Sequence, residues 1–126
     1  MKRTLISGHS PYEAVAGFSR AVLVGDRVYV SGTAPIPADG SPPPQGAYEQ
    51  ARLCLAIIGE ALARAGSGLE HVVRTNIYVT DRVHWGEVSR AHGQAFRGVR
   101  PAATCVVADL LDPAWKVEIE AEAVLP

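Results

Sequence analysis

The sequence predicts a single α+β domain of six strands and two helices. Residues 72–80 and 116–123 alternate apolar and polar side chains, which is typical of strands with two different faces. Residues 47–65 repeat apolar side chains every three or four positions, which is typical of an amphipathic helix. A chain of 126 residues is long enough for one hydrophobic core and too short for two.

The N-terminal part is predicted to hold three strands, over residues 4–7, 18–24 and 27–31. Residues 7–17 are predicted to be irregular. The dipeptide Gly25-Asp26 separates the second and third apolar runs, and such a dipeptide is typical of a tight hairpin turn. We therefore expect a β-hairpin here.

A long loop is predicted from Gly32 to Gly46. It contains five prolines, which exclude a helix or a central strand: Pro35, Pro37, Pro42, Pro43 and Pro44. Its length is near the upper limit of ordered functional loops. The sequence leaves open whether this loop closes over a cleft.

Two helices follow, and two strands end the chain. The first helix covers residues 47–65 and ends at Gly66, with Glu60 and Arg64 one turn apart on its outer face. Asp81 is predicted to cap the second helix, which stops at Gly98. Its apolar stripe is Trp85, Val88, His92, Ala95 and Phe96. The last strands are expected over residues 103–109 and 115–125.

Two helices cannot cover both faces of a six-stranded sheet, so one face must meet water or another chain. The last strand shows which side chains lie on that face. Alternation places its apolar residues under the helices and Glu118, Glu120 and Glu122 on the other face. For an isolated domain, the simplest interpretation is a solvated glutamate face.

Composition excludes several classes of protein. The net charge is −1 and the 12 basic residues are scattered, which argues against nucleic-acid binding. No apolar run approaches the roughly 18 residues of a membrane-spanning helix, and no signal-peptide pattern follows Met1, so we expect a cytoplasmic protein without membrane contact. Cys54 and Cys105 lack CxxC spacing and are predicted to be buried free thiols.

No metal or cofactor site is predicted. His84 and Glu87 are close in sequence, but no further ligands accompany them. The chain has neither a phosphate-binding loop nor a dinucleotide fingerprint. His92 on its apolar stripe is interpreted as a packing residue, and Ser31, which has no visible base, as part of a structural bend rather than a nucleophile.

Several segments, in order and spacing, resemble one known family. They are Gly17-Phe18-Ser19-Arg20, Val30-Ser31-Gly32 with Pro35, Tyr48-x-x-x-Ala51-x-x-x-Leu55, residues 72–81, and Arg100-Pro101-Ala102-Ala103-Thr104-Cys105 followed by the strand at 116–123. Together they resemble the Rid family of reactive intermediate deaminases, also called the YjgF or L-PSP endoribonuclease family. The resemblance covers nearly the whole chain.

The resemblance implies a chorismate-mutase-like fold, assembled as a homotrimer with the uncovered sheet faces turned towards one another. It also implies active clefts between adjacent subunits. Glu118 falls on the family's glutamate that orients water. Phe18 falls on its tyrosine, and Ala103 on the arginine that holds the substrate carboxylate. In such an assembly the glutamates need donors, and Arg20, Arg74 and Arg100 are the candidates.

The two replacements predict altered specificity. Alanine cannot hold a carboxylate, and phenylalanine cannot donate a hydrogen bond. One lost charge-assisted contact would weaken recognition of a 2-iminocarboxylate by roughly 2–3 kcal/mol. Arg20, two residues after Phe18 on the same predicted strand face, is the first candidate for a relocated anion anchor, and Arg100 is the second. The predicted cleft also includes Ser31, Gly32, Thr104 and Cys105.

Two functions remain open from the sequence. The first is an enzyme that deaminates an imine, an enamine or a related amine through water bound by Glu118, without a cofactor. The second is a non-catalytic protein that uses the same cleft to bind a metabolite or a partner. In both, the expected partners are a small molecule and further copies of this chain. Ribonuclease activity is disfavoured, because the chain lacks a pair of acid-base histidines and a basic groove.

Overall fold

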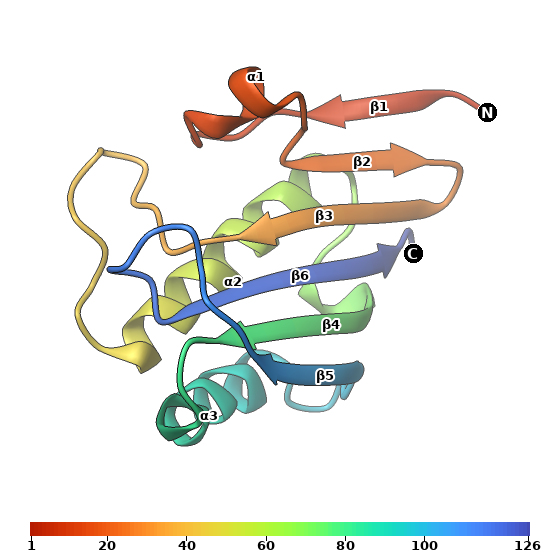
Figure 1. Ribbon diagram of the computed structural model, residues 1–126. Helices are drawn as coiled ribbons and strands as arrows, with labels where there is room; N and C mark the ends of the chain where they lie inside the picture. The colour runs from red at the N-terminus through yellow and green to blue at the C-terminus, as the bar shows by residue number, and fades with distance from the viewer.

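The computed structural model describes residues 1–126 and consists of a six-stranded sheet with two long helices behind it (Figure 1). The strands are β1 (Arg3–Ile6), β2 (Ala21–Val24), β3 (Arg27–Thr33), β4 (Val72–Val79), β5 (Ala102–Val107) and β6 (Val117–Val124). The helices are α1 (Tyr12–Ala16), α2 (Ala47–Arg64) and α3 (Trp85–Ala95), with 3₁₀ turns at Leu69–His71 and Arg82–His84.

The sheet has the strand order β1-β2-β3-β6-β4-β5. Only the β4–β5 pair is parallel, and every other pair is antiparallel. The predicted mixed sheet with its β-β-β-α-β-α-β-β order is therefore confirmed, apart from the additional short helix α1. The strands β1 and β5 form the two edges.

The predicted hairpin is confirmed at Gly25-Asp26. Val24 pairs with Arg27 directly across the turn. Gly25 has a φ of 61°, a conformation that glycine adopts without strain, at the first central position of a two-residue loop.

The core lies between the sheet and α2 and α3. Helix α2 buries the periodic residues predicted for it, and Ile58 and Leu62 are fully enclosed. In β6 every second residue is buried under the helices, namely Val117, Ile119, Ala121 and Ala123. Glu118, Glu120 and Glu122 are half-buried on the opposite face, as the alternation predicted.

Two predictions about the N-terminal segment were wrong. Residues 12–16 form helix α1 instead of an irregular segment, and Gly17 ends that helix with a φ of 76°. Helix α1 buries none of its residues, so it has no apolar stripe that the sequence could show. The second strand begins at Ala21, which leaves Phe18 and Arg20 in the connection before it.

The region around α3 also differs from the prediction. Asp81 caps the 3₁₀ turn Arg82–His84 by accepting from the backbone N–H of Val83 at 2.8 Å, and α3 begins after that turn. Trp85 was expected on the buried stripe but is 44% exposed. His92 packs as predicted: its Nε2 lies 2.8 Å from the Thr75 Oγ1, and burial lowers its pKa.

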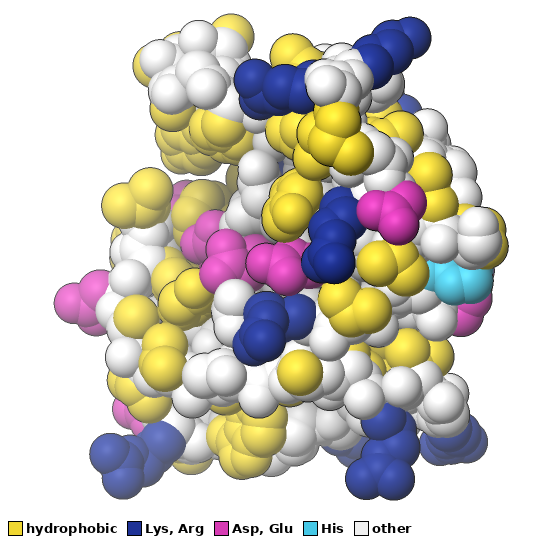
Figure 2. Space-filling model, turned by 90° about the vertical axis from the view of Figure 1, so that its right-hand side faces the viewer, with side chains coloured by type: hydrophobic (Ala, Val, Ile, Leu, Met, Phe, Trp, Pro, Cys, Tyr) yellow, Lys and Arg dark blue, Asp and Glu magenta, His cyan; other side chains and the backbone are white.

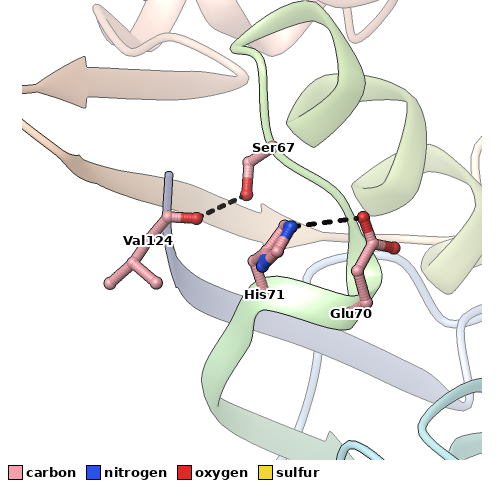
Figure 3. Close-up of polar contacts among 4 residues, drawn as sticks. All are labelled: Ser67, Glu70, His71 and Val124. Carbon is pink, nitrogen blue, oxygen red and sulfur yellow. Dashed lines mark hydrogen bonds and ion pairs between the residues drawn. The ribbon is translucent and has the colours of Figure 1, made fainter. Parts of the chain in front are cut away.

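Polar contacts fix the connection between α2 and β4 (Figure 3). Ser67 donates its hydroxyl to the backbone carbonyl of Val124 at 2.7 Å, which ties the connection to the end of β6. His71 and Glu70 are the one pair of basic and acidic side chains within 4.0 Å, with His71 Nε2 3.5 Å from Glu70 Oε1, and they form an ion pair when the imidazole is protonated. Glu60 and Arg64 form none, and Arg64 Nη1 instead donates to the carbonyl of Ser7. No helix combines the length and the apolar character needed to cross a bilayer.

Two neighbouring isoleucines test the assignment of the core face of α2. Ile58 is fully buried, whereas Ile57 is partly exposed. We expect Ile58→Ala to lower the free energy of unfolding by about 2–5 kcal/mol, because it leaves a cavity in the core. Ile57→Ala should lower it by less than half as much. Urea unfolding measures both values, and equal losses would contradict the assigned face.

Candidate functional site

A cavity of about 320 Å³ lies between α1, the connection before β2, and the strands β3 and β6. It brings together five residues that the sequence predicted for the site, namely Phe18, Arg20, Ser31, Gly32 and Glu118. We call it the Glu118 cavity. These five residues come from three separate parts of the chain, the connection before β2, strand β3 and strand β6, so the sheet pairing is what assembles them.

Glu118 reaches this cavity across a bulge in β3. Val30 pairs with Ala121 and Thr33 pairs with Ile119, so β3 holds one more residue than β6 over this interval. A Cβ added to Gly32 would lie 2.6 Å from Oε2 of Glu118. The carboxylate can therefore rest against the backbone of the bulge only because residue 32 has no side chain.

Arg20 holds the bulge in place. Its side chain is 6% exposed, and its Nη2 donates to the carbonyl oxygens of Ser31 and Gly32, both at 2.7 Å. Ser31 adds two contacts, because its hydroxyl donates to the carbonyl of Ser19 at 2.7 Å and its N–H donates to the carbonyl of Arg20 at 3.1 Å. Arg20 Nε is buried and has no hydrogen-bond partner.

The surroundings make Glu118 a stronger base than an ordinary carboxylate. Burial raises the pKa of Glu118, the positive charge of Arg20 acts in the opposite direction, and Glu120 adds a smaller increase. Burial also lowers the pKa of Arg20, although its neighbours Glu13 and Glu118 favour the charged form. A carboxylate with a raised pKa is better matched to proton transfer near neutral pH.

The rest of the cavity wall is mostly apolar and aromatic. Tyr12 and Trp115 form an edge-to-face pair with ring centroids 6.5 Å apart. Phe18 is 38% exposed and lines the same wall. Arg20 is the only basic side chain of the lining. The arrangement suits an apolar ligand whose reactive centre faces Glu118.

The remaining predicted site residues lie at the other edge of the sheet. Ala103, Thr104 and Cys105 belong to β5 and line a separate cavity of about 530 Å³ with Arg82 and Trp85. Arg100 is exposed and has a φ of 52°. Within one chain, these residues do not meet Glu118. Cys54 and Cys105 are both free, as predicted. Cys54 is also buried as predicted, but the prediction was wrong for Cys105, which is only half-buried because it lies on the edge strand β5.

The glutamates of the open face have other partners than expected. Glu120 accepts from the Tyr78 hydroxyl at 2.7 Å and from Asn76 Nδ2 at 3.1 Å, and the first contact raises the pKa of Tyr78. Within one chain, none of the three candidate arginines forms an ion pair with a glutamate. Glu120 instead has neutral donors, because the register places Asn76 directly opposite it.

Acidic and basic side chains also lie next to one another at the side of the sheet. Figure 2, which views the right-hand side of Figure 1, shows acidic side chains near the middle of that surface with Lys and Arg side chains beside them. Arg74, Glu120 and Glu122 line a shallow cavity of about 180 Å³ on the open face, together with Tyr29 and Asn76.

Two aromatic residues of the cavity wall were not predicted as site residues. Tyr12 belongs to α1, which was expected to be irregular, and no pattern in the sequence marked it. Trp115 was expected only as the first residue of the last strand. It is 6% exposed and reaches the cavity from the segment before β6.

Comparison with known proteins gives a consistent result. The family model described as endoribonuclease L-PSP matches residues 8–125. The 2-iminobutanoate/2-iminopropanoate deaminase of Rattus norvegicus is 34% identical over 123 residues, which cover 97% of this chain and 90% of that protein. A RutC family protein of Sinorhizobium fredii, y4sK, is 38% identical over 118 residues, covering 92% and 93%.

Solved structures agree with these relatives. Rv2704 of Mycobacterium tuberculosis, described as a member of the YjgF/YER057c/UK114 family, superposes with a TM-score of 0.89 at 41% identity. The match covers 98% of this chain and 100% of that one. Yeast Mmf1 superposes with the same TM-score at 27% identity, covering 99% and 100%.

Removal of the Glu118 charge should stabilise the protein in a pH-dependent way. The pKa of Glu118 is higher in the folded protein than in the unfolded chain, so the folded protein holds this proton more tightly. The resulting stabilisation of the fold is complete at pH values below the pKa of the unfolded chain. It is lost as the pH rises through the pKa of the folded protein. We expect Glu118→Gln to raise Tm at pH 8 and to have a smaller effect at pH 4.

Thermal unfolding at the two pH values measures this difference. Glu122→Gln is the matched control, because it removes a carboxylate from the same face of β6 outside the cavity. A Tm of Glu118→Gln below that of the wild type at pH 8 would contradict the assigned electrostatics.

Proposed function

Because the chain belongs to the YjgF family, also called the Rid or endoribonuclease L-PSP family, we propose that it hydrolyses small imines in the Glu118 cavity. The observation that supports the proposal is the position of Glu118. Its carboxylate, with a raised pKa, rests against the Gly32 backbone in a cavity with apolar walls. The deaminase relative supports the same class of reaction.

The reaction requires one group that moves a proton in both directions. Glu118 takes a proton from water while the water oxygen bonds to the carbon of the protonated imine, which gives a carbinolamine. Glu118 then gives this proton to the nitrogen and takes the proton of the new hydroxyl group as the C–N bond breaks, so that ammonia leaves with a carbonyl compound. Ammonia finally takes the proton from Glu118, which restores the carboxylate and gives ammonium. Water and imine are consumed in equal amounts, and no cofactor is needed. An enamine joins this route once a proton shift has converted it to the imine.

The cavity favours substrates that lack a carboxylate. Ala103 stands where deaminating relatives place an arginine, so the guanidinium fork of those enzymes is absent here. Arg20 does not replace it fully, since its Nη2 already donates to two carbonyl oxygens. The walls formed by Tyr12, Phe18 and Trp115 favour an apolar or aromatic substituent on the imine carbon.

Deamination assays test the proposal directly. We expect ammonia release from an apolar imine generated in the assay to exceed the buffer background in the wild type. Glu118→Gln should abolish that excess, because the amide cannot accept the proton. Release from 2-iminopropanoate should be weak in the wild type and should increase in Ala103→Arg. Turnover unchanged by Glu118→Gln would exclude the mechanism.

A second candidate function is binding without catalysis. By the resemblance, Ala103 replaces the family's arginine and Phe18 replaces its tyrosine, and each replacement removes a polar contact to the substrate. These two losses favour binding without catalysis. Saturable binding of imine analogues by the wild type, without ammonia release from any imine tested, would support this function instead.

We further propose that three copies of the chain assemble with their open sheet faces together. The exposed edge strand β5, with Val106 and Val107 exposed, is available to a neighbour. In that assembly Ala103, Thr104 and Cys105 of one copy would complete the Glu118 cavity of the next. Light scattering should give a mass three times that of the 13.4 kDa chain. A monomer at micromolar concentration would contradict the assembly.

A further inference from the structure

A second cavity, of about 170 Å³, lies against the outer side of α2. Its lining includes residues 8–10, parts of the segment that follows β3, and one side of α2 from Leu53 to Arg64. We call it the α2 cavity. Neither Glu118 nor any residue of β5 contributes to it. It shares with the Glu118 cavity only Ser10, Arg20, Ala34 and Ile36.

Two guanidinium groups line the α2 cavity without a carboxylate partner. The only ion pair of the structure joins His71 and Glu70, so neither Arg20 nor Arg64 has a carboxylate oxygen within 4.0 Å. Arg20 is 6% exposed and its Nε has no hydrogen-bond partner. Glu13 and Glu118 are near enough to favour the charged form of Arg20, but neither forms an ion pair with it, so part of the donor capacity of Arg20 is unused.

The other lining residues define the remainder of a ligand. Glu60 is the only acid among them and His9 the only histidine, so with neutral His9 the two arginines leave a formal charge of +1. The walls are aliphatic, formed by Ala34, Ile36, Leu53, Ile57 and Ala61 together with Ala38 and Ala56. No aromatic side chain takes part. This surface fits a short branched hydrocarbon chain.

We propose that the α2 cavity is a second ligand site that binds a small aliphatic carboxylate. The carboxylate faces Arg20 and Arg64, and each of them keeps N–H groups that do not donate to a backbone carbonyl. The hydrocarbon part lies against Leu53 and Ile57. The site shares Arg20 with the Glu118 cavity but does not include Glu118, and the inference does not rest on the proposed function.

Binding of 3-methylbutanoate to ¹⁵N-labelled protein tests the proposal. We expect saturable NMR shifts in residues 8–10 and 53–64. Ile57→Trp should abolish the binding by filling the cavity, whereas Ile57→Leu, which conserves volume, should retain it. Arg64→Gln should weaken it by about fivefold or more, whereas Arg64→Lys should lose less because it keeps the charge. The neutral isostere 3-methylbutanamide should bind more weakly than the acid.

Two results would overturn the site. The first is the absence of saturable shifts with 3-methylbutanoate in the wild type. The second is binding that survives Ile57→Trp and shifts Phe18, Gly32 and Glu118, since this would place the carboxylate in the Glu118 cavity. The same titration with Glu118→Gln separates the two proposals, because the α2 cavity should still bind the acid when the variant has lost deamination.

Discussion

The contact on which the rest of the site depends is the one between the Arg20 guanidinium and the carbonyl oxygens of Ser31 and Gly32. It fixes the extra residue of β3, and that extra residue creates the backbone surface on which the Glu118 carboxylate rests. Arg20 also supplies the positive charge that opposes the effect of burial on Glu118. One buried side chain thus fixes the position of the Glu118 carboxylate, while burial, which Arg20 only partly offsets, raises its pKa.

The proposed change of specificity rests on what the cavity contains. The carboxylate, the glycine beside it and the bulge are present in the structure. By the resemblance to the deaminating members, Ala103 replaces an arginine and Phe18 replaces a tyrosine. The aromatic and aliphatic walls of the cavity are the basis for proposing apolar substrates. The proposal therefore keeps the type of reaction and changes its substrate.

The sequence predicted the features that depend on local periodicity. The alternation in β6 placed Glu118 on the face away from the helices, and the periodic apolar residues of α2 marked its buried side. Features that depend on pairing between distant segments could not be predicted. Asn76 is the partner of Glu120 only because of the register between β4 and β6. Arg20 precedes β2 because the exposed helix α1, which has no apolar stripe, ends at Gly17 and is followed by a connection.

The central claim is that Glu118 is a base whose pKa is raised by its cavity. The most direct measurement is a pH titration of the ¹³C side-chain carboxyl signal of Glu118 in the wild type, assigned by comparison with Glu118→Gln. The account predicts a midpoint above the ordinary glutamate value of 4.5. A midpoint at or below that value would show that Arg20 and solvent dominate the site, and would contradict the account.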